Sequence, residues 1–121
     1  MLKRRIKSFR YAFRGIKDLF ASQPHFRFHL AAAAMAVSLG AVLRISTASW
    51  LAVLICIGSV LTAEAFNSSL EKVCDALHPE VHPLIRMAKD MSAAAVLISA
   101  VIAIAVGMIV FAPGLLAMLR P

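Results

Sequence analysis

The chain has few charged residues, few acidic residues and few cysteines. Only 16% of its 121 residues are charged, and six Asp and Glu stand against 13 Lys and Arg. With 61% hydrophobic residues and a mean hydropathy of +0.84, this composition excludes an ordinary soluble domain and is typical of a membrane protein. The two cysteines, Cys56 and Cys74, are too few for a disulfide framework, and we interpret them as ordinary thiols.

Two further sequence signals are absent. No GxxxxGK[ST] loop and no protein-kinase motif occurs, which excludes an ordinary soluble kinase fold. We also expect no signal peptide, because the basic head of the chain is too long for an n-region and no small-residue cleavage site follows a short apolar stretch.

The basic residues gather on one side of three long apolar runs. Eight of the 13 precede the first run and three lie between the second and third, whereas Arg44 and Arg120 lie on the other side. Because cytoplasmic segments are rich in Lys and Arg, this distribution predicts a cytoplasmic N-terminus and an external C-terminus. Membrane orientation thus accounts for the net charge of +7, and we expect no nucleic-acid partner.

The hydrophobic pattern predicts an all-α membrane protein that forms a single membrane-embedded domain over residues 1–121. In the first segment, apolar residues recur at steps of four and three opposite a basic face: Leu2, Ile6, Phe9, Phe13, Ile16 and Phe20. This pattern predicts an amphipathic helix over residues 2–20 in the membrane interface, although such a helix can also serve only as an anchor. The three spans are expected in helices at residues 29–48, 50–75 and 84–119.

The sequence HPEVHP, from His78 to Pro83, predicts a loop between the second and third spans. Its two histidines lie four residues apart, as two ligands on one helix would. Pro79 and Pro83 make a shared helical face improbable, so we do not expect a metal site there.

The most informative segment runs from Glu64 to Asp75, where carboxylates follow a strongly apolar stretch. At about 100° per residue, one stripe of a helix contains four polar side chains: Glu64, Asn67, Glu71 and Asp75. A carboxylate at the edge of a bilayer is costly and suggests a functional site. Such a line of oxygen ligands suits Mg²⁺, which favours a few carboxylates together with phosphate oxygens and water. The alternative is a polar helix face that packs against a partner.

A second group of polar residues begins the third apolar helix, at Lys89 and Asp90. Carboxylates for a metal ion, a carboxylate within the apolar layer and a lysine for phosphate are the groups that phosphoryl transfer requires. Because a single protomer with three spans has little interior of its own, we expect oligomerisation to cover the polar stripe.

These residues resemble the small prokaryotic integral-membrane diacylglycerol kinases and their undecaprenol kinase relatives. The similarity covers almost the full length, through four segments: SFRYAFRGIK (Ser8 to Lys17), FRFH (Phe26 to His29), EAFNSSLEKVCD (Glu64 to Asp75) and MAKDMSAAAVL (Met87 to Leu97). The resemblance implies a homotrimer in the bacterial inner membrane, with ATP as co-substrate, Mg²⁺ as cofactor and active sites shared between subunits.

The resemblance also implies roles for residues of the second span. Glu64 matches the proposed catalytic base beside the lipid hydroxyl, and Asn67 matches the asparagine next to it. Glu71 matches a carboxylate that binds the metal accompanying ATP, while Asp75 matches a further acidic residue that supports the site.

The nucleotide contacts implied by the resemblance come from two other segments. Lys89 matches a lysine that contacts the transferring phosphate, and Asp90 is its neighbour near the nucleotide. Arg4, Tyr11 and Gly15 fall where the interfacial helix approaches the nucleotide and closes the site.

One position departs from the family pattern. Members usually carry a glutamate three residues before the Phe of FRFH as a second metal ligand, whereas this chain has Gln23. An amide still offers one oxygen to Mg²⁺ but removes a negative charge, so metal affinity should fall unless another group substitutes.

We therefore expect an ATP-dependent lipid kinase that converts diacylglycerol to phosphatidic acid or undecaprenol to undecaprenyl phosphate. Two alternatives remain at this stage. Gln23 is compatible with a catalytically impaired or regulatory homologue, and a membrane-embedded glutamate is compatible with a small proton-coupled exporter. An exporter normally needs an acidic residue deeper in a span and repeated helices, which this sequence lacks.

Overall fold

The structure, a computed structural model, describes residues 2–80 and 82–119, with side chains from residue 7 onward. The described residues form four helices in chain order: α1 (Leu2–Ser22), α2 (Pro24–Leu43), α3 (Thr47–Leu77) and α4 (Pro83–Leu119). The predicted all-α fold is confirmed. Three of the helices, α2, α3 and α4, are long and apolar enough to cross a membrane.

Local chemistry explains where α2 begins and ends. Pro24 lies in its first turn, where a missing N–H removes no helical hydrogen bond. At the other end, Arg44 adopts φ 50° and ψ 49°, and its N–H donates back to the carbonyls of Gly40 and Ala41. The helix expected at 29–48 is therefore shifted in the structure, because the left-handed residue stops it at Leu43.

Ser46 starts the next helix directly after this turn. Its Oγ accepts a hydrogen bond of 3.2 Å from the Ser49 N–H, a regular N-cap. So short a connection makes α2 and α3 antiparallel neighbours. A 20-residue helix such as α2 is about 30 Å long, which matches the hydrocarbon layer of a bilayer.

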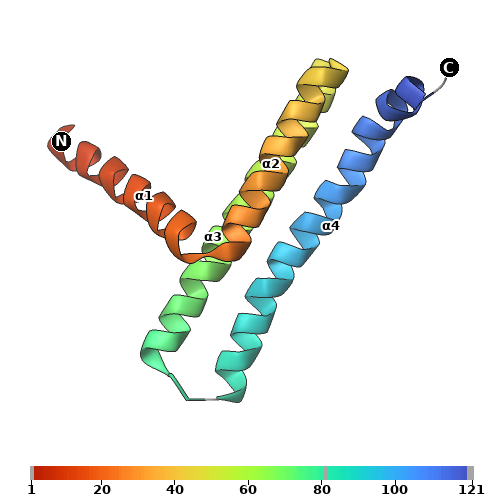
Figure 1. The fold of residues 1–121 in the computed structure, drawn as a ribbon. Helices are drawn as coiled ribbons and strands as arrows, with labels where there is room; N and C mark the ends of the chain where they lie inside the picture. The colour runs from red at the N-terminus through yellow and green to blue at the C-terminus, as the bar shows by residue number, and fades with distance from the viewer. Residues whose placement is uncertain (1, 81, 120–121) are drawn as a thin grey trace.

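The helices are arranged as a hairpin with two additions (Figure 1). α3 packs chiefly against α4, and α2 packs against α3 and less extensively against α4. α1 leaves the start of α2 at a steep angle and makes its main contacts with α2. Beyond the α1–α2 junction, the C-terminal part of α3 has only the first turns of α4 beside it.

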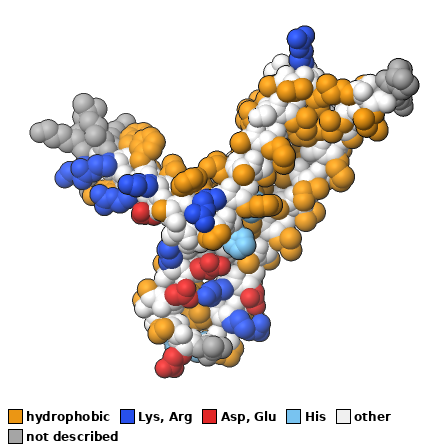
Figure 2. Space-filling view, viewed as in Figure 1, with side chains coloured by type: hydrophobic (Ala, Val, Ile, Leu, Met, Phe, Trp, Pro, Cys, Tyr) orange, Lys and Arg blue, Asp and Glu red, His pale blue; other side chains and the backbone are white. Residues whose placement is uncertain are grey.

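Polar and apolar surfaces separate along the length of this hairpin. Figure 2 shows mainly hydrophobic side chains over the far parts of α2 and α4, apart from a basic side chain at the tip, whereas acidic side chains mix with basic ones near the α3–α4 loop and basic side chains follow α1. No described residue of α4 is buried, although the helix is strongly apolar. Such a surface requires lipid or another protein chain around it.

Candidate active site

The buried residues of α3 form one stripe that changes from apolar to polar along the helix. At steps of mostly three, four and seven residues, its members are Val53, Val60, Glu64, Asn67, Ser68 and Cys74. This spacing places them on the face that packs against the other helices. The polar stripe expected from the sequence is thus a continuation of the packing face of α3.

Glu64 is the deepest acidic side chain of this stripe. It is only 4% exposed, although its carboxylate oxygens are not fully enclosed, and it makes no hydrogen bond or ion pair with another residue that the structure describes. A buried carboxylate without a partner is unfavourable for folding alone. Its burial therefore points to a functional role for Glu64.

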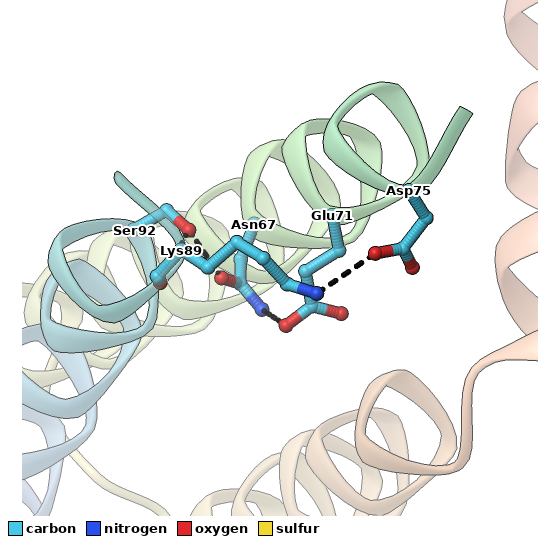
Figure 3. A network of polar contacts seen from close by, with 5 residues as sticks. All are labelled: Asn67, Glu71, Asp75, Lys89 and Ser92. Carbon is cyan, nitrogen blue, oxygen red and sulfur yellow. Dashed lines mark hydrogen bonds and ion pairs between the residues drawn. The ribbon is translucent and has the colours of Figure 1, made fainter. Parts of the chain in front are cut away.

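A chain of hydrogen bonds joins Ser92 on α4 to Asn67 and Glu71 on α3 (Figure 3). Ser92 Oγ on α4 donates to Asn67 Oδ1 at 2.7 Å, and Asn67 Nδ2 donates to Glu71 Oε1 at 3.2 Å. Asn67 is 8% exposed. Both the oxygen and the nitrogen of the Asn67 side-chain amide are therefore hydrogen-bonded, and the amide holds the Glu71 carboxylate through its Oε1 atom alone.

An ion pair lies beside this chain. Lys89 Nζ on α4 donates to Asp75 Oδ1 on α3 at 2.9 Å. Lys89 precedes the apolar run of α4. The pKa of its ammonium group is raised, mainly by the hydrogen bond to Asp75, and loss of solvent around the group opposes this rise. The ion pair with Asp75 therefore favours the charged form of Lys89.

The structure does not bring every candidate residue into this cluster. Asp90 pairs instead with Arg86 at 3.1 Å, in an exposed contact along α4. Tyr11 is 57% exposed and lies under the Arg14 guanidinium, and a Cβ at Gly15 would meet no atom within 4 Å. The side chain of Arg4 lies outside the described part of the structure.

An apolar groove lies between α2, α3 and α4, and Glu64 is not part of its lining. The groove has a volume of about 410 Å³ and is lined by residues of α2, α3 and α4, including Phe28, His29, Val60 and Leu61. Val60 lies one helical turn before Glu64. A hydrocarbon chain in this groove would approach the carboxylate.

Comparison with known proteins shows the family. The family of prokaryotic diacylglycerol kinases matches residues 10–111, most of the chain. The chain belongs to this family. An undecaprenol kinase of Bacillus subtilis is 35% identical over 94% of this chain and 93% of its own length. Diacylglycerol kinases of Synechocystis and Escherichia coli are 32% and 30% identical, over 93% and 82% of this chain and 65% and 81% of their own lengths.

These matches confirm the predicted family and the predicted class of enzyme, a lipid kinase. They do not favour the exporter or the impaired homologue. The matched residues include the polar cluster of α3 and α4, which consists of Asn67, Glu71, Asp75, Lys89 and Ser92. They also include Tyr11, Gly15 and Gln23.

The donor set of this kinase fits a metal ion that arrives with a nucleotide. Among the described residues, no group of three His, Cys, Asp or Glu side chains could hold a metal by itself. Mg²⁺ commonly uses one or two protein carboxylates and takes its other ligands from phosphates and water. Glu71 meets that requirement, since Asn67 donates to its Oε1 and no other described residue bonds its second carboxylate oxygen.

Gln23 lies at the N-cap of α2, at the junction with α1. It is half-buried, and its side chain makes no capping hydrogen bond. The two histidines of the α3–α4 loop do come close, with ring centroids 5.4 Å apart. His82 Nδ1 accepts a hydrogen bond from Leu84 N, so in neutral His82 the other ring nitrogen carries the proton and is not free to bind a metal ion.

Sequence reasoning missed two serines of this kinase. Ser92 was missed because a serine in an apolar helix commonly bonds its own backbone, and only the packing of α4 on α3 reveals Asn67 as its partner. Ser68 is 1% exposed, and its Oγ has no hydrogen-bond partner among the described residues. Its position four residues after Glu64 was the available signal.

Proposed function

We propose that the kinase transfers the γ-phosphoryl group of ATP to the hydroxyl of a membrane lipid alcohol, diacylglycerol or undecaprenol. The main support is the burial of Glu64, which is 4% exposed on the helix that also carries the Asn67–Glu71 pair. A base is then available at the apolar end of the cluster and a metal ligand at its polar end. The apolar groove, whose lining includes Val60 one helical turn before Glu64, supports a lipid as the acceptor.

In the proposed reaction, Glu64 accepts the proton of the lipid hydroxyl while the hydroxyl oxygen attacks the γ-phosphorus of ATP. The bond between the γ-phosphorus and the bridging oxygen breaks, and ADP leaves. Bound Mg²⁺ supplies charge neutralisation at the phosphates, and Glu71 would hold it, with Gln23 as a second oxygen ligand. Lys89 releases its ion pair with Asp75 and then contacts the transferring phosphate.

The proposed enzyme is a homotrimer of the bacterial inner membrane. The exposed apolar surface of α4 supports neighbouring subunits. The position of Tyr11, Gly15 and Asp90 outside the cluster supports a nucleotide site completed on assembly. α1 lies in the cytoplasmic interface as an amphipathic helix, with Phe9, Phe13 and Phe20 more than half exposed and available to lipid.

The test is transfer of radiolabelled γ-phosphate by the purified protein in mixed micelles that contain either diacylglycerol or undecaprenol. We expect label in one of the two lipid products, which identifies the substrate. A matched reaction with Glu64→Gln controls for contaminating kinases. Label in neither lipid, from protein that is folded and trimeric by light scattering, would refute the proposal.

A further inference from the structure

Ser92 differs from five other helical serines in what its hydroxyl reaches. Ser22, Ser38, Ser59, Ser69 and Ser99 each donate to the backbone carbonyl four residues earlier, at 2.7–2.8 Å. Ser92 Oγ lies 2.9 Å from the Lys89 carbonyl and only 2.7 Å from Asn67 Oδ1, on a different helix. The second contact is not a by-product of helix geometry.

One proton must serve these two acceptors. A hydroxyl donates once and accepts through its lone pairs, whereas a carbonyl only accepts. If the proton of Ser92 went to the Lys89 carbonyl, the hydroxyl could meet Asn67 only as an acceptor, and the amide would have to present its nitrogen. Donation to Asn67 Oδ1 instead fixes which end of the amide faces α4.

The orientation of the amide decides what Glu71 meets. With Oδ1 on Ser92, Nδ2 donates to Glu71 Oε1 at 3.2 Å (Figure 3). A reversed amide would place its oxygen against the carboxylate, which repels it. The hydroxyl of Ser92 thereby favours one position of Glu71, with Oε1 engaged and the second carboxylate oxygen left for a cation.

From this geometry we infer that Ser92 is a positioning residue for the metal–nucleotide site, acting through Asn67 on Glu71. The inference rests on the proposed role of Glu71 as a metal ligand. Hydrogen-bond partners of metal ligands typically change metal affinity by about 10–100-fold when removed. Ser92 is one bond further from the metal than such a partner, so the lower end, about tenfold, is expected.

The experiment compares three variants of the full-length protein: Ser92→Ala, Ser92→Thr and Ser99→Ala. Ser99 is a matched control, because it lies on α4, is half-buried like Ser92 and donates only to its own helix, at Ala95 O. Binding of Mn²⁺ with a non-hydrolysable ATP analogue is measured by electron paramagnetic resonance, which needs no turnover. The Mg²⁺ dependence of transfer and the KM for lipid are measured in parallel.

We expect Ser92→Ala to weaken Mn²⁺–nucleotide binding about tenfold and to raise the Mg²⁺ concentration for half-maximal rate, with the lipid KM unchanged. Ser92→Thr, which keeps the hydroxyl, and Ser99→Ala should bind as the wild type does. Unchanged binding by Ser92→Ala, an equal loss in Ser99→Ala, or no Mn²⁺–nucleotide binding by the wild type would overturn the inference. Wild-type protein that binds Mn²⁺–nucleotide but labels no lipid would refute only the proposed function, and the binding comparison would still decide the role of Ser92.

Discussion

Lys89 Nζ donates a 2.9 Å hydrogen bond to Asp75 Oδ1 and thereby ties the first turns of α4 to the last turns of α3. The lysine that the proposed reaction needs for phosphate is therefore occupied by a carboxylate. The two side chains are 36% and 68% exposed, so solvent screens their attraction. Exposed ion pairs contribute at most about 1 kcal/mol, which an incoming phosphate can replace.

Asp75→Asn should therefore lower the KM for ATP, because the amide competes less strongly with phosphate for Lys89. A change of up to about fivefold corresponds to the 1 kcal/mol of an exposed pair. Steady-state kinetics at saturating Mg²⁺ and lipid measure it. Glu80→Gln is the control, since it removes an exposed charge in the adjacent loop that makes no ion pair with Lys89. A higher KM for Asp75→Asn would show that Asp75 itself supports the nucleotide.

The polar stripe of α3 was predictable from the sequence, but its partners were not. A period of 3.6 residues is a local property, so the sequence indicated that Glu64, Asn67 and Glu71 share a face. The contact between Asn67 and Ser92 depends on the packing register of α3 and α4. That register follows from the whole interface between α3 and α4, which no local pattern encodes.

The four helices were likewise predictable, whereas their ends and directions were less so. Apolar runs of this length predict spans by composition alone. The stop at Leu43 depends on the left-handed conformation of Arg44, a residue type with no strong preference for it. The steep departure of α1 depends on the α1–α2 junction at Gln23, whose backbone geometry no local pattern specifies.

Glu64→Gln should abolish phosphoryl transfer while leaving nucleotide affinity nearly intact, because the proposed role of Glu64 is to remove a proton. Positioned general bases contribute about 10²–10⁴-fold to the rate. Turnover is compared with nucleotide titration on the same preparation, and Glu80→Gln controls for loss of a carboxylate. Turnover above about a tenth of the wild-type value would exclude Glu64 as the base.

Ser68→Ala should leave stability unchanged or raise it by up to about 1 kcal/mol, because removing a buried hydroxyl without a partner removes an unfavourable burial. Unfolding by SDS titration in mixed micelles measures the change. The adjacent Ser69→Ala is the control, as its exposed hydroxyl donates to Ala65 O at 2.8 Å. A loss of more than about 1 kcal/mol in Ser68→Ala alone would reveal a partner for Ser68 in the assembled enzyme.

Reporter fusions should place the N-terminus and the 78–82 loop in the cytoplasm, and the Arg44–Ser46 turn and the C-terminus outside. The physical reason is the distribution of Lys and Arg, eleven on one side and two on the other. Alkaline phosphatase is active only outside and green fluorescent protein only inside, so paired fusions at each site control for expression. A fluorescent C-terminal fusion would contradict the three-span topology.

Gln23→Glu should raise activity or lower the Mg²⁺ concentration needed for half-maximal rate. Gln23 offers one neutral oxygen where the family resemblance implies a carboxylate, and its side chain makes no capping hydrogen bond that the change would break. A negative charge at the N-terminus of α2 is also favourable by about 0.3–1 kcal/mol, so the variant should fold.

The transfer rate is measured against Mg²⁺ concentration for the wild type, Gln23→Glu and Gln23→Ala. The last variant is the control that removes the side-chain oxygen. If a carboxylate such as Asp75 already serves as second ligand, added charge would repel it, and the Gln23→Glu curve would be unchanged or shifted to higher Mg²⁺. That result, with Gln23→Ala unchanged, would remove Gln23 from the metal site.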